Sequence, residues 1–176
     1  MCEQFIIQNG IIIINNYNNI YNLPNLLEYN DTIDILFKNC NLVKIPQIPF
    51  NFLQVLRFDN CNTKMIKVPL LMPNLKMLTI WNCSILEIPF LNGLNSLSVI
   101  ALDNCPNIIN INPINLKNIK VLFLKDCNGI TDIPLIINLE QLIIENLQNC
   151  KNINISKNCE LIINDKIKDK YNIIKH

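Results

Sequence analysis

The sequence contains very little glycine, alanine and histidine. It has three glycines, one tryptophan, a single alanine at Ala101 and a single histidine at His176. No G-x-G-x-x-G or P-loop pattern occurs, so a glycine-rich phosphate-binding loop is excluded. A catalytic cysteine needs a neighbouring base to form its thiolate, and His176, the last residue, is the only imidazole. Nucleophilic catalysis by cysteine is therefore not expected.

The sequence also lacks an excess of charge and any long hydrophobic run. Fifteen basic and 14 acidic residues give a net charge of +1, which provides no electrostatic footprint for nucleic acid. No stretch approaches the roughly 18 to 20 apolar residues of a membrane span. The run Ile11 to Ile14 is too short for a signal-peptide core, and no basic segment precedes it. We expect an intracellular, cytoplasmic protein with neither a membrane nor a nucleic-acid partner.

Isoleucine and asparagine are abundant instead and together make up more than a third of the chain, and the eight cysteines are regularly placed. Five of the cysteines recur at an even spacing of about 22 residues: Cys40, Cys61, Cys83, Cys105 and Cys127. There is no C-x-x-C pair, so a zinc site is not expected. An even series of single cysteines indicates a repeated core position.

Apolar residues keep a fixed spacing to each of these cysteines. The four clearest copies are Leu53-x-x-Leu56-x-Phe58-x-x-Cys61, Leu75-x-x-Leu78-x-Ile80-x-x-Cys83, Leu97-x-x-Ile100-x-Leu102-x-x-Cys105 and Ile119-x-x-Leu122-x-Leu124-x-x-Cys127. Proline follows each repeat, in Ile45-Pro46, Val68-Pro69, Ile88-Pro89, Ile111-Asn112-Pro113 and Ile133-Pro134. Weaker copies flank these four. The first copy in the chain contains Ile12, Ile14, Tyr17 and Leu23-Pro24, and the second contains Ile35, Phe37 and Cys40. A copy on the C-terminal side contains Leu139, Leu142, Ile144 and Leu147. Leu161 and Ile163 indicate a terminal strand.

The pattern resembles the leucine-rich repeat, whose signature is L-x-x-L-x-L-x-x-N/C-x-L. The resemblance covers roughly residues 8 to 165, and the cysteine with its later Ile-Pro is similar to the repeats of plant-type intracellular immune receptors. The segment Cys127 to Asp132 is similar to the cysteine-containing subtype found behind F-box domains. The resemblance implies an arc with a parallel β-sheet on its concave face and a habit of binding ligands.

The pattern predicts stacked coils without reference to any family. A strand of about five residues cannot bury its apolar side alone, whereas successive copies can pair in parallel and cover one another. Coils as short as these leave room only for extended or 3₁₀ return segments. We therefore predict one repeat-solenoid domain over residues 1–176, with an N-terminal cap at about 1–10, repeats over about 11–149 and a C-terminal repeat and cap over about 150–176.

Strand positions that alternate with the core positions should face outward. Two residues before each cysteine or its equivalent stand Lys38, Asp59, Trp81, Asp103, Lys125 and Glu145, and four residues before stand Leu36, Arg57, Thr79, Ala101, Phe123 and Ile143. The candidate binding residues in these columns are Arg57, Asp59, Trp81, Asp103, Phe123 and Lys125. Trp81 is the expected anchor, because an exposed tryptophan flanked by charge is typical of interface hot spots. A half-covered aromatic packed on Met77 or Thr79 is the alternative reading.

These observations predict a non-enzymatic module that binds a protein partner through the concave face, without a cofactor, a metal or a small-molecule substrate. Asp59 and Asp103 could form a carboxylate pair for glycoside hydrolysis, but a shallow arc excludes little water, so this hypothesis is weaker. Two other classes stay open. One is a structural or self-associating protein, because a solenoid exposes strand edges. The other is a host-directed adaptor or decoy of a parasite or large DNA virus. Only the Ile- and Asn-rich composition, which is typical of AT-rich genomes, and the stand-alone length suggest it.

Overall fold

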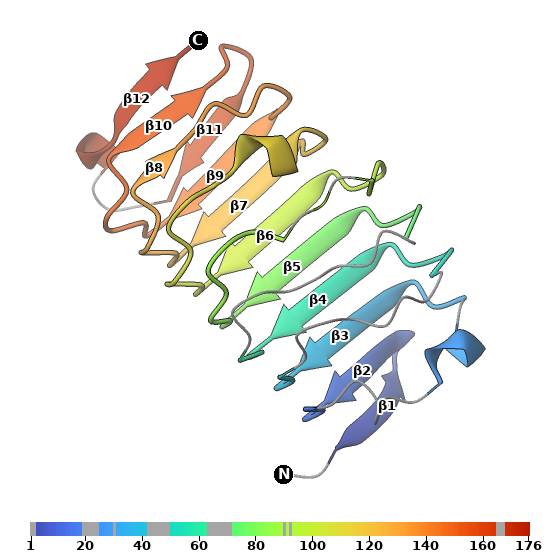
Figure 1. Ribbon diagram of the computed structural model, residues 1–176. Helices are drawn as coiled ribbons and strands as arrows, with labels where there is room; N and C mark the ends of the chain where they lie inside the picture. The colour runs from blue at the N-terminus through green and yellow to red at the C-terminus, as the bar shows by residue number, and fades with distance from the viewer. Residues whose placement is uncertain are drawn as a thin grey trace.

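The protein is described here as a computed structural model, which covers residues 3–18, 25–29, 31–41, 50–62, 72–89, 91, 93–164 and 168–176. The chain forms a β-solenoid in which successive coils each add a strand to one long sheet (Figure 1). This sheet has nine strands in the order β1-β2-β3-β4-β5-β6-β7-β9-β11. Their bounds are Gln4–Gln8, Ile11–Asn15, Asp34–Lys38, Val55–Asp59, Met77–Trp81, Val99–Asp103, Val121–Lys125, Gln141–Glu145 and Glu160–Ile163.

The strands form at the predicted positions because apolar and polar residues alternate there. In β4, β6, β7 and β9 the second and fourth residues are buried and the others are partly exposed. Equivalent residues pair in register, so Leu56 lies beside Leu78 and Leu78 beside Ile100. Each coil thus extends a continuous core. The predicted repeat solenoid, with a parallel sheet built from evenly repeated coils, is confirmed.

The five evenly spaced cysteines occupy the corner after the strand, facing the core, whereas Cys150 and Cys159 lie just before β10 (Asn152–Ile155) and β11. All seven cysteines in the described residues are buried and free of disulfides. Each sits close to strand carbonyls, as the Cys40 Sγ does at 3.2 Å from the Ile14 oxygen and the Cys105 Sγ at 3.4 Å from that of Ile80. A thiol is small enough for this corner and donates weakly to a carbonyl. The interpretation of the cysteines as core residues is confirmed, and Leu147 fills the same place with no exposure.

The asparagine or aspartate before each of the five evenly spaced cysteines, and before Tyr17 and Leu147, adopts a left-handed backbone conformation. Positive φ angles of about 50° to 63° occur at Asn16, Asn39, Asn60, Asn82, Asn104, Asp126 and Asn146. Asn and Asp tolerate this region better than other residues with a Cβ. The amide of Asn60 also donates to Asn39 and that of Asn104 to Asn82, so side chains bond along the column. These bonds and the backbone angle together explain why asparagine recurs at this position.

The first strand departs from the repeat. β1 runs antiparallel to β2, with Gln8 opposite Ile11. The two residues between them, Asn9 and Gly10, have φ angles of 52° and 77°, as a type I′ hairpin turn requires. The segment predicted only as an N-terminal cap is thus half of a β-hairpin.

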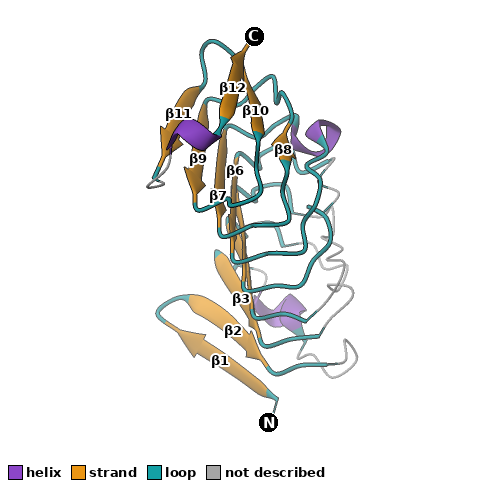
Figure 2. Cartoon of the chain, turned by 90° about the vertical axis from the view of Figure 1, so that its left-hand side faces the viewer, coloured by secondary structure: helices purple, strands orange, loops and turns teal. Residues whose placement is uncertain are grey.

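The return segments contain almost no helix. Three short 3₁₀ helices are present in the described residues: η2 (Leu26–Tyr29), η3 (Pro113–Leu116) and η4 (Lys168–Lys170). A second, parallel sheet consists of three strands, β8 (Asp132–Ile133), β10 (Asn152–Ile155) and β12 (Asn172–Lys175). It lies on the side of the last coils that is opposite β9 and β11 (Figure 2). Extended and 3₁₀ return segments were predicted, but this sheet was not.

The sequence places an apolar residue and a proline in every return segment up to Pro134. The isoleucines that precede three of the prolines, Ile88, Ile111 and Ile133, are buried. The proline positions Leu23-Pro24, Ile45-Pro46 and Val68-Pro69 lie outside the described residues. In the part of the chain that the structure describes, no helix is both long and apolar enough to cross a membrane.

Candidate functional site

The candidate site is the face of the long sheet that points away from the core, which we call the open face. It carries three columns of side chains, one from every second residue of each strand. Over β4, β5, β6, β7 and β9 the first column is Val55, Met77, Val99, Val121 and Gln141, the middle column is Arg57, Thr79, Ala101, Phe123 and Ile143, and the third is Asp59, Trp81, Asp103, Lys125 and Glu145. All six predicted binding residues therefore lie on this face.

Two of the columns form a continuous apolar surface. We call it the apolar band, and its members are Val55, Met77, Val99, Ala101, Val121, Phe123 and Ile143. All seven side chains are partly exposed. The sequence placed Ala101, Phe123 and Ile143 on this face, but only Phe123 was named as a binding candidate. The other four members form the column six residues before each cysteine, which was not singled out. That column alternates with the core positions in the same way, so the signal was present.

Trp81 lies at one margin of the band. It pairs in register with Asp59 on one side and Asp103 on the other. Its side chain is partly exposed, whereas Thr79, two residues earlier on the same face, is 3% exposed. The Thr79 hydroxyl oxygen is buried and has no hydrogen-bond partner. The face is thus tightly packed beside the tryptophan, and Trp81 still presents part of its surface to solvent.

The charges in the third column neutralise one another toward β9. The Lys125 ammonium lies 3.3 Å from the Glu145 carboxylate and 4.0 Å from that of Asp103. The hydrogen bond to Glu145, with the added field of Asp103, raises the pKa of Lys125. Partial burial raises the pKa of the Asp103 carboxyl, and Lys125 opposes that rise. The three groups form a paired cluster rather than separate free charges.

Arg57 is paired with a residue that the sequence analysis did not single out. Its guanidinium lies 2.5 Å from the carboxylate of Asp34, the first residue of β3. Burial raises the pKa of Asp34 despite Arg57, and one oxygen of Asp34 and the Nε of Arg57 are buried without partners. Asp59, which the sequence grouped with Arg57, instead accepts a hydrogen bond from the Asn82 amide at 2.9 Å. Diagonal pairs such as Arg57 with Asp34 depend on register and side-chain direction.

The titratable groups considered for catalysis each have a defined place in the structure. Asp59 and Asp103 are separated by the strand that carries Trp81. The ring of His176 bonds the side chain of Asn154 at 3.1 Å. Burial raises the pKa of the Cys150 thiol to about 11, so it stays protonated at neutral pH. Among the described residues, no group of three or more His, Cys, Asp and Glu side chains is placed to hold a metal ion.

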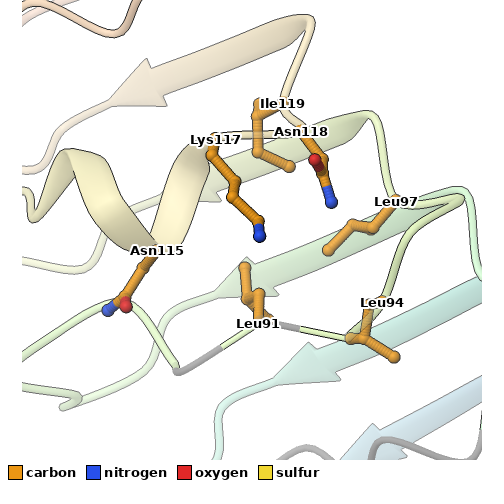
Figure 3. A pocket seen from close by; sticks show the side chains of 7 residues that line it. All are labelled: Leu91, Leu94, Leu97, Asn115, Lys117, Asn118 and Ile119. Atoms are coloured by element: carbon orange, nitrogen blue, oxygen red, sulfur yellow. The ribbon is translucent and has the colours of Figure 1, made fainter.

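Three hollows in the described surface lie outside the open face. Figure 3 shows a crevice in which Lys117 extends over leucines of the preceding coil, and it is too narrow to hold a water molecule. A wider apolar hollow of about 430 Å³ lies beside η3, and one of about 660 Å³ lies between β11 and β12. The apolar hollow is lined by Pro113, Ile114, Lys117, Leu135, Ile137 and Asn138. The six predicted binding residues line none of these three hollows.

No protein-family model matches the chain, and no curated protein matches it either.

Proposed function

We propose that this protein is a leucine-rich-repeat module that binds a protein partner through the open face, and that this face is the concave side of an arc. The strand pattern and the cysteine corner support the assignment, because they repeat the spacing of the leucine-rich-repeat signature over most of the chain. Function rests on the surface rather than on the fold, since one fold serves many functions.

The observation that carries the proposal is the apolar band with a partly exposed tryptophan at its margin. From β4 to β9 the band crosses five strands, a width of about 20 Å at the usual strand spacing. Partly exposed apolar side chains in one contiguous surface mark an interaction site more often than isolated ones do. The expected partner is a protein segment with apolar side chains along one side.

The third column of the open face is mostly charged, and it favours a partner whose surface is polar where the two meet. Lys125 is already paired with Asp103 and Glu145, and Arg57 with Asp34. Docking therefore covers charges that keep their partners, which avoids most of the penalty for burying an unpaired charge. These groups orient the partner, and the apolar band with Trp81 supplies most of the affinity.

The scaffold supports two further parts of the proposal, a role in binding without catalysis and a cytoplasmic location. A stiff stack of coils loses little conformational entropy when it docks, which suits a binding module without catalysis, cofactor or metal. The cytoplasmic location is supported by the free cysteines, because disulfides form in oxidising compartments and thiols persist in reducing ones.

The test is a comparison of proteins retained from a native lysate by matched variants. Four chains are compared, of which the wild type is the reference. Trp81→Ala and Val99→Asp change the open face, and Ile137→Ala removes a side chain that is 78% exposed outside it. We expect one protein to be retained by the wild type and Ile137→Ala and lost with the other two. With that partner purified, Trp81→Ala should weaken the binding free energy by about 2 kcal/mol, measured by calorimetry. Equal binding of all four chains would show that the open face is not the site.

A further inference from the structure

The outer edge of β1 is an unpaired strand edge. β1 ends the order of the nine-stranded sheet and pairs only with β2 among the described strands. In an antiparallel ladder, alternate residues bond the neighbour and the others direct their N–H and C=O groups outward. Gln8 and Ile11 flank a two-residue turn and so form a hydrogen-bonded pair. Phe5 and Ile7 therefore direct their backbone groups to the outer edge.

The strand β1 lacks two residue types that usually prevent strand pairing, which are charged residues and proline. Its sequence, Gln-Phe-Ile-Ile-Gln, contains no charge and no proline. Ile6 is 40% exposed and Ile7 is 56% exposed. The edge strands near the other end of the solenoid carry charge instead, with Glu160 in β11 and Lys175 in β12. Charged side chains and proline on edge strands prevent association, and β1 lacks both.

We propose that the β1 edge pairs with the same edge of a second copy of this chain, antiparallel and centred on Ile6. The strand is self-complementary in that register. Ile6 faces Ile6 of the second copy, Phe5 faces Ile7, and Gln4 faces Gln8, so apolar residues meet apolar ones and amides meet amides. The outward groups of Phe5 and Ile7 then bond one another across the two-fold axis.

The proposed pairing also explains why an isoleucine on the core side of the sheet is exposed. Phe5 and Ile7 pair with Ile14 and Ile12, which are core residues, so both point to the core side. Phe5 packs against the core and against Tyr29, with ring centroids 5.1 Å apart. Ile7 lies more than half exposed on that side. In the dimer, Phe5 of the second copy lies beside Ile7 and covers it, an aromatic and β-branched cross-strand pair.

The dimer would join two nine-stranded sheets into one, with both open faces on the same side. Only the short strand β1 of each copy forms the contact, so its area falls below that of a standard interface. A weak dimer is expected, populated at concentrations on the order of 100 μM and above. The inference is independent of the proposed partner binding, because it involves the edge of the sheet and not the apolar band.

Sedimentation equilibrium over a concentration series tests the pairing. The wild-type mass should rise from the 20.4 kDa of one chain toward twice that value. Ile6→Lys puts two ammonium groups at the two-fold axis and should raise the dissociation constant about tenfold or more. Ile174→Lys is the matched control, since Ile174 is 39% exposed on another edge strand, and it should dimerise as the wild type does. A wild type that stays monomeric at about 1 mM, or equal effects of the two substitutions, would overturn the proposal.

Disulfide trapping tests the register. In a Cys2→Ser background, Ile6→Cys should form a disulfide-linked dimer under mild oxidation, because a non-hydrogen-bonded pair brings Cα atoms to about 4.5 Å. Gln8→Cys alone should not, because the two copies of residue 8 lie roughly 13 Å apart in this register. A mixture of Gln4→Cys and Gln8→Cys chains should again cross-link. Preferential cross-linking of Gln8→Cys to itself would contradict the register centred on Ile6.

Discussion

The coils that follow β5 and β6 differ from the coils that follow β7 and β9 in what lies opposite the long sheet. In the earlier coils the return side holds turns, the 3₁₀ helix η3 and one isolated bridge between Glu87 and Asn110. In the later coils it holds β8 and β10, which form the second sheet together with β12 after β11. The later coils are also shorter, because successive strands of the long sheet begin closer together after β7. The first residues of β5, β6, β7, β9 and β11 are Met77, Val99, Val121, Gln141 and Glu160.

The difference follows the distribution of proline. Pro134, which directly follows β8, is the last of the nine prolines in the chain. Proline has no N–H to donate to a ladder and is confined to edges and bulges of sheets. The return segments without proline form β10 and β12, and a straight extended return needs fewer residues than an irregular one. The longer strands on this side of the coils, β10 and β12, thus occur where proline is absent, and the two-residue strand β8 ends at Pro134.

The largest expected effect comes from placing a proline in the second sheet. Asn154→Pro removes an N–H from β10, the central strand of the three, and leaves a neighbouring carbonyl without its donor. We expect a loss of about 3 kcal/mol or more in the free energy of unfolding, measured by urea denaturation. Asn154→Ala keeps the N–H, loses only the side-chain bonds to Ile133 and His176, and should cost about 1 kcal/mol. Similar losses for both variants would show that the backbone ladder of β10 contributes little.

The second prediction concerns the boundary between the two kinds of coil. Gly129 lies just before β8, and a Cβ there would approach the backbone oxygens of Pro106 and Ile108 to 2.4 and 2.5 Å. Backbone atoms cannot move aside as a flexible side chain would, so Gly129→Ala should destabilise the protein by about 2 to 3 kcal/mol in thermal or urea unfolding. Gly10→Ala is the contrasting variant, because a Cβ at Gly10 meets open space and only the φ of 77° is unfavourable. That variant should cost about 1 kcal/mol, and a larger loss than that of Gly129→Ala would contradict the steric argument.

The strands of the long sheet were predictable because their signal is local and repeated. Leu78 and Ile80 stand at fixed distances from Cys83, and the same distances recur in the neighbouring coils. The second sheet was not predicted, although the absence of proline after Pro134 was visible in the sequence. The β-hairpin was also missed, although Asn9-Gly10 is the dipeptide that a type I′ turn favours.

The candidate site was predictable in its columns but not in its pairings. Alternation along each strand places Trp81 and Phe123 on one face, which the structure shows. The ion pair of Arg57 with Asp34 joins residues on adjacent strands and in different columns, so it depends on side-chain direction as well as on alternation. The burial of Thr79 likewise depends on the size of its neighbours across three strands. Such contacts emerge only when the coils are stacked.

The third prediction concerns the left-handed residue that follows each strand of the long sheet. Its contribution to stability should be the same whether the return side of the coil is a turn or a strand. Asn82 in one of the longer coils and Asn146 in one of the shorter coils have φ angles of 52° and 53°. Alanine at either position loses the amide bonds and must adopt the left-handed region, so we expect a loss of about 1 to 2 kcal/mol for both in urea unfolding. Glycine adopts that region freely, so Asn82→Gly and Asn146→Gly should lose less. A large loss at Asn82 with none at Asn146 would indicate that the corner depends on the kind of coil.

The smallest effect expected is a change in pH dependence caused by Cys150, which lies just before β10. Burial raises the pKa of its thiol from 9.0 to about 11, so between these values the folded protein keeps a proton that the unfolded chain has lost. The unfolded state binds fewer protons in this window, and the free energy of unfolding therefore falls as the pH rises through it. Cys150→Ala removes this contribution, so its free energy of unfolding should decline less steeply between pH 9 and pH 11 than that of the wild type. Leu147→Ala removes a buried side chain that does not titrate, and should lower the curve without changing its slope. A slope for Cys150→Ala equal to that of the wild type would mean that this thiol is as accessible to solvent in the folded coil as in the unfolded chain.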